Sequence, residues 1–182
     1  MSIGNEDRKL ILICVDGADP EILYSMIHNS EFPSLKTIMN NGVHGYLTSL
    51  APPISPAVWI SLATGLSPLD HGVFDFIQIY MSKRLPRIVM HTSRALQGIS
   101  IWDYISMAGL RSVVINYPFT YPSYPINGIM VSGFPSPTNL PDITPKITLP
   151  QDIITKYCTE FIPTISHVEN YNDAVSIVTE SS

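Results

Sequence analysis

The sequence predicts a layered α/β fold with a mostly parallel sheet, because short apolar runs alternate along the chain with helical patterns. Lys9 to Val15 and Ser112 to Ile115 are continuous apolar runs of strand length, which is typical of strands buried on both faces of a parallel sheet. The 182 residues, 45% of them hydrophobic, are enough for one sizeable core. We therefore expect a single α/β domain over residues 1–182.

The first elements follow from local start and stop signals. Residues 19–21, Asp-Pro-Glu, supply a cap, an N1 proline and a first-turn acid for a helix that runs to about His28. Residues 32–33, Phe-Pro, precede a second helix that ends near residues 40–42. Val43 to Leu50 predicts a strand.

The most informative stretch is Ala51 to Phe76. Within it Ser55 precedes Pro56 and an apolar run with helical spacing, and the run stops at Gly65. Serine before a proline at the first helical position predicts a helix start, and glycine predicts its end. The Ser55 hydroxyl is thus expected at a helix N-terminus, where unpaired N–H groups and the macrodipole favour an anion such as phosphate. A serine that only caps its helix is the simpler interpretation of this feature alone.

The next stretch, through Leu96, is predicted to be a loop followed by irregular structure. It holds four of the chain's cations, which most simply form a solvated face: Lys83, Arg84, Arg87 and Arg94. Ile101 to Met107 then predicts a helix that stops at Gly109, before the apolar run at 112–115.

The last third is rich in proline. Eight of the sixteen prolines lie in residues 118–150, so this region is expected to be extended, rigid loop around a strand-like segment at Gly128 to Ser132. Pro150 to Phe161 predicts a helix, and residues 166–182 have no clear pattern.

Charge and cysteine content restrict the possible partners. Ten Lys and Arg against fifteen Asp and Glu give a net charge of −5, which argues against a nucleic-acid scaffold or an anionic membrane as partner and leaves only a local basic patch open. A small phosphorylated substrate fits better. Cys14 and Cys158 cannot form a disulfide framework, so a cytoplasmic location fits best. The longest apolar run, Leu10 to Val15, is too short for a spanning helix or a signal peptide.

Asp16 is a candidate metal ligand. It follows the first predicted strand directly, and Gly17 lets the chain turn there. In parallel sheets ligands gather beyond the carboxyl ends of the strands, and a carboxylate at that place suits Mg, Mn or Zn. The alternative is an ordinary turn-forming Asp-Gly pair, which this feature alone favours.

Three segments together resemble the amino-terminal part of the type I phosphodiesterase/nucleotide pyrophosphatase family of the alkaline phosphatase superfamily. They stand in the family's order within about Leu10 to Pro135: VDGADPEIL at 15–23, SLAPPISPAVWISLATGLSPLDHGVFDF at 49–76, and IWDYISMAGLRSVVINYPFTYP at 101–122.

The resemblance implies an alkaline-phosphatase-like α/β/α fold, incomplete at its carboxyl-terminal end, in a metal-dependent hydrolase of phosphodiester or phosphomonoester bonds. It implies that Ser55 is the nucleophile, that Asp16 and Ser55 are metal ligands, and that two divalent ions, Zn or Mn/Mg, act in the complete site. It also implies that the remaining ligands come from a carboxyl-terminal half that this chain lacks. We therefore expect at most partial metal binding and weak or no activity.

Two positions limit this transfer. Phe76 stands where nucleotide-cleaving members carry an asparagine that helps to hold the phosphate, so nucleotide specificity is not implied. Residues 70–72, Asp-His-Gly, imitate a metal-binding motif of the family but match a different segment, and we do not make His71 a ligand. The other histidines lack ligand spacing and are expected to be structural or on the surface: His28, His44, His91 and His167.

Two further interpretations remain open beside the hydrolase. One is a non-catalytic α/β remnant that binds an anion or a protein partner. The other is a mutase or sulfatase-like relative of the same fold, although the residues around Ser55, ISPAV, do not match the C-x-P-S/A-R segment expected of sulfatases.

Overall fold

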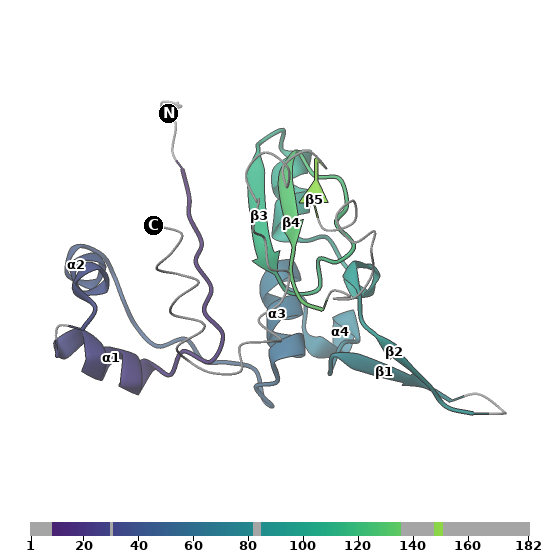
Figure 1. Cartoon of the computed structure of the whole chain (residues 1–182), viewed down its shortest axis with the longest axis horizontal. Coiled ribbons are helices and arrows are strands. Elements are labelled where there is room, and N and C mark those ends of the chain that lie inside the picture. Colours follow the sequence, from purple (N-terminus) through teal and green to yellow (C-terminus); the bar gives the residue numbers. More distant parts are fainter. Residues whose placement is uncertain (1–8, 30, 82–84, 136–147, 151–182) are drawn as a thin grey trace, which may run out of the picture. The chain divides into compact units, whose positions relative to one another are not determined.

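The computed structural model describes residues 9–29, 31–81, 85–135 and 148–150, and it divides the chain into two compact units, 1–49 and 50–182 (Figure 1). The elements, in chain order, are α1 (Pro20–His28), α2 (Pro33–Asn41), α3 (Ser55–Thr64), α4 (Pro68–His71), β1 (Ile77–Tyr80), β2 (Arg87–Met90), η1 (Ser93–Ala95), α5 (Ile101–Met107), β3 (Ser112–Tyr117), β4 (Gly128–Ser132) and β5 (Thr148–Leu149). The helix predicted at 150–161 lies almost wholly outside the described residues. That helix therefore stays a prediction. The organisation as a single domain also stays a prediction.

The first unit contains the helices α1 and α2, and both were predicted. The Asp19 carboxylate caps α1, because its Oδ1 accepts hydrogen bonds from the N–H groups of Glu21 at 2.9 Å and Ile22 at 3.1 Å. These bonds satisfy two of the N–H groups that a helix start leaves without an intrahelical partner. The local capping signal was therefore sufficient to locate this helix.

The two strands predicted in the first unit are wrong. Residues 9–15 and 43–50 are described and contain no strand, and Leu10 and Ile11 leave 87% and 82% of their surface exposed. A strand forms only where another chain segment pairs with its N–H and C=O groups, and α1 and α2 offer no such ladder. The apolar run has strand length and composition, but these alone do not supply the pairing.

The second unit contains a three-stranded sheet of order β3-β4-β5 and a separate two-stranded hairpin, β1-β2. The β3 and β4 strands are parallel, from Ser112 opposite Gly128 to Tyr117 opposite Ser132, whereas β4 pairs with β5 and β1 with β2 in antiparallel fashion. The chain is thus a small α/β protein with one short parallel pair. The strands predicted at 112–115 and 128–132 are confirmed. The predicted burial of 112–115 on both faces is wrong, because Val113 and Ile115 leave 63% and 65% of their surface exposed, and the described strands are not mostly parallel, since only β3-β4 pairs that way.

The core of the second unit lies where α3 and α5 pack against the sheet. One buried cluster joins four residues from four elements: Ala63 of α3, Trp102 of α5, Val114 of β3 and Met130 of β4. A second cluster joins Ile60, Val73 and Phe119. The start of α5 is fixed by a capping box between Ser100 and Asp103.

The hairpin β1-β2 and the short helix α4 lie in the stretch that was predicted to be loop and irregular structure. The β1 segment, Ile-Gln-Ile-Tyr, alternates in polarity over only four residues, which is too short for a clear period-2 signal. The prediction of an irregular stretch was therefore wrong for residues 77–80 and 87–90.

Position 128 of β4 requires glycine because its backbone lies against β3. Gly128 has φ +150°, and a Cβ added there would lie 1.8 Å from the carbonyl oxygen of Ser112. Gly109 also has a positive φ, +73°, but has nothing within 4 Å of such a Cβ. Both alanine variants carry backbone strain of about 1–2 kcal/mol, and only Gly128→Ala adds the clash.

We expect Gly128→Ala to lower the free energy of unfolding by at least about 2 kcal/mol more than Gly109→Ala. Urea denaturation followed by tryptophan fluorescence measures this, because Trp59 and Trp102 both belong to the second unit. Equal losses in the two variants would show that β4 can move away from β3 without cost.

Candidate active site

Ser55 is the first residue of helix α3, whose N-cap is Ile54 in an extended conformation with φ −90° and ψ 124°. The helix thus starts where the sequence predicts, but Ser55 occupies the first helical position instead of the cap. Its side chain is half-buried. The first-turn N–H groups of a helix have no intrahelical acceptor, and Pro56 contributes none, so the donors available to an anion come from the backbone beside Ser55.

Gly65 ends α3, as predicted from the sequence. Its φ is +72°, the left-handed conformation typical of a helix C-cap, and its N–H donates to the carbonyl oxygen of Ser61 at 2.8 Å. The helix that carries Ser55 therefore has both ends defined by local chemistry.

Tyr117, at the carboxyl end of β3, attaches α3 to the sheet. Its hydroxyl donates to the carbonyl oxygen of Trp59 at 2.7 Å, and its ring lies edge-on to the rings of Trp59 and Trp102, with centroids 5.1 Å and 4.9 Å apart. In Figure 1 the arrow of β3 points toward α3. Ser55 is therefore on a helix that contacts the carboxyl end of a parallel strand, and ligands of α/β proteins usually gather beyond this end of the strands.

His71 holds α3 to the segment that follows it. It is buried, its Nε2 lies 3.0 Å from Ser61 Oγ, and its Nδ1 accepts a hydrogen bond from the N–H of Val73 at 3.1 Å. Because Nδ1 accepts, the proton of the neutral ring is on Nε2, which donates to Ser61. Both ring nitrogens thus have protein partners, and His71 is a structural residue of this helix pair.

Burial lowers the pKa of His71 below its ordinary value of 6.5, although the carbonyl of Ala57 and the negative charge of Asp70 oppose the shift. The neutral ring therefore dominates at neutral pH. The sequence did not reveal this role, since His71 stands in a motif-like Asp-His-Gly and its partner Ser61 is ten residues earlier.

Phe76 belongs to an aromatic cluster. Its ring stacks on Phe119 at a centroid distance of 5.6 Å and lies edge-on to Phe134 at 5.4 Å. A phenyl ring has no hydrogen-bond donor for a phosphate oxygen. The structure thus gives Phe76 a packing role. This agrees with the sequence analysis, in which Phe76 in place of an asparagine does not imply nucleotide specificity.

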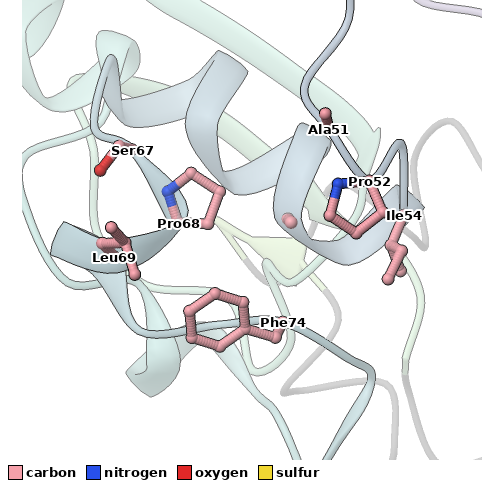
Figure 2. A pocket seen from close by; sticks show the side chains of 8 residues that line it. Ala51, Pro52, Ile54, Ser67, Pro68, Leu69 and Phe74 are labelled. Atoms are coloured by element: carbon pink, nitrogen blue, oxygen red, sulfur yellow. The ribbon is translucent and has the colours of Figure 1, made fainter.

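A pocket of about 330 Å³ lies beside the start of α3 (Figure 2). Its apolar lining comes from the loop before α3, the two helix starts and the segment after α4: Pro52, Ile54, Ala57, Pro68, Leu69 and Phe74. Its single hydroxyl side chain, Ser67, donates to Asp70 Oδ2 at 2.6 Å. Figure 2 shows Ser67, Pro68 and Leu69 on one side and Ala51, Pro52 and Ile54 on the other. Without a charged lining residue this pocket suits an apolar group and does not by itself hold a phosphate.

Asp16 lies in the first unit, in an exposed turn with Gly17, whose φ is +68°. Asp16 and Ser55 supply oxygen donors, which suit Mg, Mn or Zn, but together they supply only two ligands. In the part of the chain that the structure describes, no group of three or more His, Cys, Asp or Glu residues could hold a metal ion. The described residues therefore do not build a two-metal centre by themselves. Among them there is also no helix long and apolar enough to cross a membrane.

Comparison with known proteins places almost the whole chain in one family. The family model described as "Type I phosphodiesterase / nucleotide pyrophosphatase" matches residues 10–179. No curated protein and no solved structure matches the chain. The match includes Asp16, Ser55 and the segment from Ser61 to Val73.

The arrangement around His71 predicts a pH dependence of stability. Because the folded state lowers the pKa of His71, the unfolded state binds more protons below pH 6.5. The free energy of unfolding should therefore fall as the pH decreases from about 6.5, by up to about 1.4 kcal/mol per pH unit for one such group. His91 also has a lowered pKa, so the contribution of His71 needs a variant.

We expect His71→Gln to cost about 1–3 kcal/mol at pH 8, because the Val73 N–H or the Ser61 hydroxyl loses its partner, and to flatten the acid limb of the profile. Thermal unfolding of both proteins between about pH 5 and pH 8 measures the difference. If the two proteins gave parallel pH profiles, His71 would not be the source of the loss of stability at low pH.

Proposed function

The chain belongs to the type I phosphodiesterase/nucleotide pyrophosphatase family, and from this premise we propose that it hydrolyses a phosphodiester or phosphomonoester through the Ser55 hydroxyl. The observation that carries the proposal is the place of Ser55 at the first position of α3. A serine at this position has its hydroxyl beside backbone donors that favour a negatively charged phosphate.

The proposed chemistry is a displacement at phosphorus. Ser55 Oγ forms a bond to phosphorus as the bond to the leaving oxygen breaks, and the Ser55 proton passes to solvent. The leaving group departs with the electron pair, and water then cleaves the phosphoserine ester and restores the hydroxyl. The N–H groups of the first turn of α3 stabilise the charge that develops on the phosphoryl oxygens.

We further propose that Asp16 and Ser55 are ligands of a divalent ion, Zn or Mn/Mg. When bound, such an ion lowers the pKa of a hydroxyl and offsets charge on phosphate oxygens. Two oxygen ligands bind a cation weakly, so metal affinity and turnover by this chain should both be low.

We also propose that the substrate is a small phosphorylated molecule. Phe76 cannot hold the phosphate of a nucleotide as the asparagine of nucleotide-cleaving family members does, so we do not propose a nucleotide. The stacking of Phe76 on Phe119 supports this, because it gives the position a packing role. A chain located in the cytoplasm would meet such substrates.

The second candidate function is a non-catalytic α/β protein that binds an anion or a protein partner. It is favoured by one observation, the lack of any three-ligand group within the described residues. In that case a phosphate would bind at α3 without any bond being broken, and metal ions would have no effect.

Removal of the Ser55 hydroxyl tests the hydrolase directly. The wild type should hydrolyse bis(4-nitrophenyl) phosphate slowly in the presence of Mn, and we expect Ser55→Ala to reduce this rate to that of the buffer without protein, since the nucleophile is lost. Ser34→Ala is the matched control, because it removes an exposed hydroxyl of α2 that the proposal does not use. Equal rates for Ser55→Ala and the wild type would refute the role of Ser55, and metal-independent phosphate binding without turnover would support the second candidate.

The role of Asp16 has a separate test in metal binding. We expect calorimetric titration of Mn or Zn to show weak binding to the wild type and none to Asp16→Asn, which keeps the size of the side chain but removes its charge. Asp19→Asn is the control, because Asp19 serves as the helix cap of α1. Identical titrations of wild type and Asp16→Asn would exclude Asp16 as a ligand.

A further inference from the structure

The hairpin formed by β1 and β2 has one face that is wholly apolar. The register pairs Ile77 with Met90 and Ile79 with Ile88, and the alternate pairs, Gln78 with Val89 and Tyr80 with Arg87, lie on the other face. Successive side chains of a strand point to opposite sides, so the first two pairs share one side. We call these four residues the apolar hairpin face: Ile77, Ile79, Ile88 and Met90.

The apolar hairpin face is exposed. Ile79 leaves 56% and Ile88 leaves 67% of its surface open, and every residue of both strands is exposed. Met81, which follows β1 with the same alternation, is 83% exposed. A two-stranded hairpin is marginally stable in water, and burial of its apolar face would stabilise it. These four residues are therefore available to an apolar partner.

The size of the face argues against a second copy of the chain as that partner. The ladder is four residue pairs long. It therefore covers about 13 Å by about 10 Å, or roughly 130 Å². A stable dimer buries about 800 Å² on each partner. Binding to a lipid surface depends on the buried apolar area together with the attraction of basic residues to anionic headgroups, so a smaller apolar face is sufficient when cations are present.

Most of the charge close to the hairpin in the sequence is positive. The exposed carboxylate of Asp75, two residues before β1, opposes it and acts on His91, the residue after β2. No Asp or Glu occurs between Asp75 and Asp103, and the described cations there are Arg87 and Arg94, both exposed. The sequence adds Lys83 and Arg84, which are outside the described residues and are not counted in the face. Residues 76–102 are thus a basic segment within a chain whose net charge is −5. Each such cation near an anionic lipid surface contributes about 1 kcal/mol of attraction.

We propose that the apolar hairpin face docks on an anionic lipid surface. The four apolar side chains enter the boundary between headgroups and acyl chains, and Arg87 and Arg94 pair with the lipid phosphates that surround the inserted hairpin. This attachment needs no spanning helix. It also modifies the expectation drawn from net charge, which averages over the whole chain. The inference does not depend on phosphoester hydrolysis.

Co-sedimentation of the purified 182-residue chain with vesicles tests the proposal. We expect binding to vesicles of equal parts phosphatidylglycerol and phosphatidylcholine, little binding to phosphatidylcholine alone, and loss of binding as salt rises from about 0.1 M to about 0.5 M. The double variant Ile79→Ser, Ile88→Ser should lower the partition coefficient at least about tenfold. Arg87→Gln should lower it about fivefold. Leu110→Ser and Arg111→Gln, exposed residues outside the hairpin, are the matched controls and should bind as the wild type does.

Equal binding to both kinds of vesicle, no binding to either, or unchanged binding by the hairpin variants would each overturn the proposal. A dimer in analytical ultracentrifugation that the double variant abolishes, without vesicle binding, would assign the face to a second copy instead. Tryptophan fluorescence checks that the double variant folds. If it does not, Arg87→Gln against Arg111→Gln still decides the question.

Discussion

The contact between Tyr117 and Trp59 is the constraint on which the candidate active site depends. A parallel strand ends at Tyr117, and the hydroxyl of this residue fixes a backbone carbonyl in the middle of α3 while its ring contacts two tryptophans. One such hydrogen bond contributes about 1 kcal/mol and each aromatic pair about 0.5–1.5 kcal/mol beyond area burial. Together they are a sizeable part of the 5–15 kcal/mol that usually stabilises a domain. The position of Ser55 relative to the sheet follows from this contact, and His71 adds a second one through Ser61.

The helices could be predicted because their signals are local. Asp19 before Pro20 and Gly65 after Thr64 each act within one turn, and residues 101–107 have helical spacing. Each of these helices starts or ends within a residue of the expected place. The strands at 9–15 and 43–50 could not be predicted in the same way. Strand formation depends on a partner that the run itself does not specify, and apolar composition does not replace the partner.

The candidate active site was predictable in part for the same reason. Ser55 at a helix start follows from the Ser-Pro pattern, but the contacts that position the helix join residues 58 positions apart for Tyr117 and ten apart for His71. For Phe76 the sequence showed that an asparagine of the family is absent. Only the structure showed that the ring stacks on Phe119. The charge pattern of the hairpin was visible in the sequence, but its apolar face needed the register of β1 and β2.

The most direct test of the account is to identify the residue that becomes phosphorylated. Incubation of the chain with bis(4-nitrophenyl) phosphate and Mn, a rapid acid quench and mass-spectrometric peptide mapping require only one chemical event per molecule, so slow turnover is no obstacle. The account predicts a nitrophenyl phosphate ester on Ser55 and no adduct in Ser55→Ala. An adduct on a different residue, or no adduct on Ser55 while substrate is consumed, would contradict it.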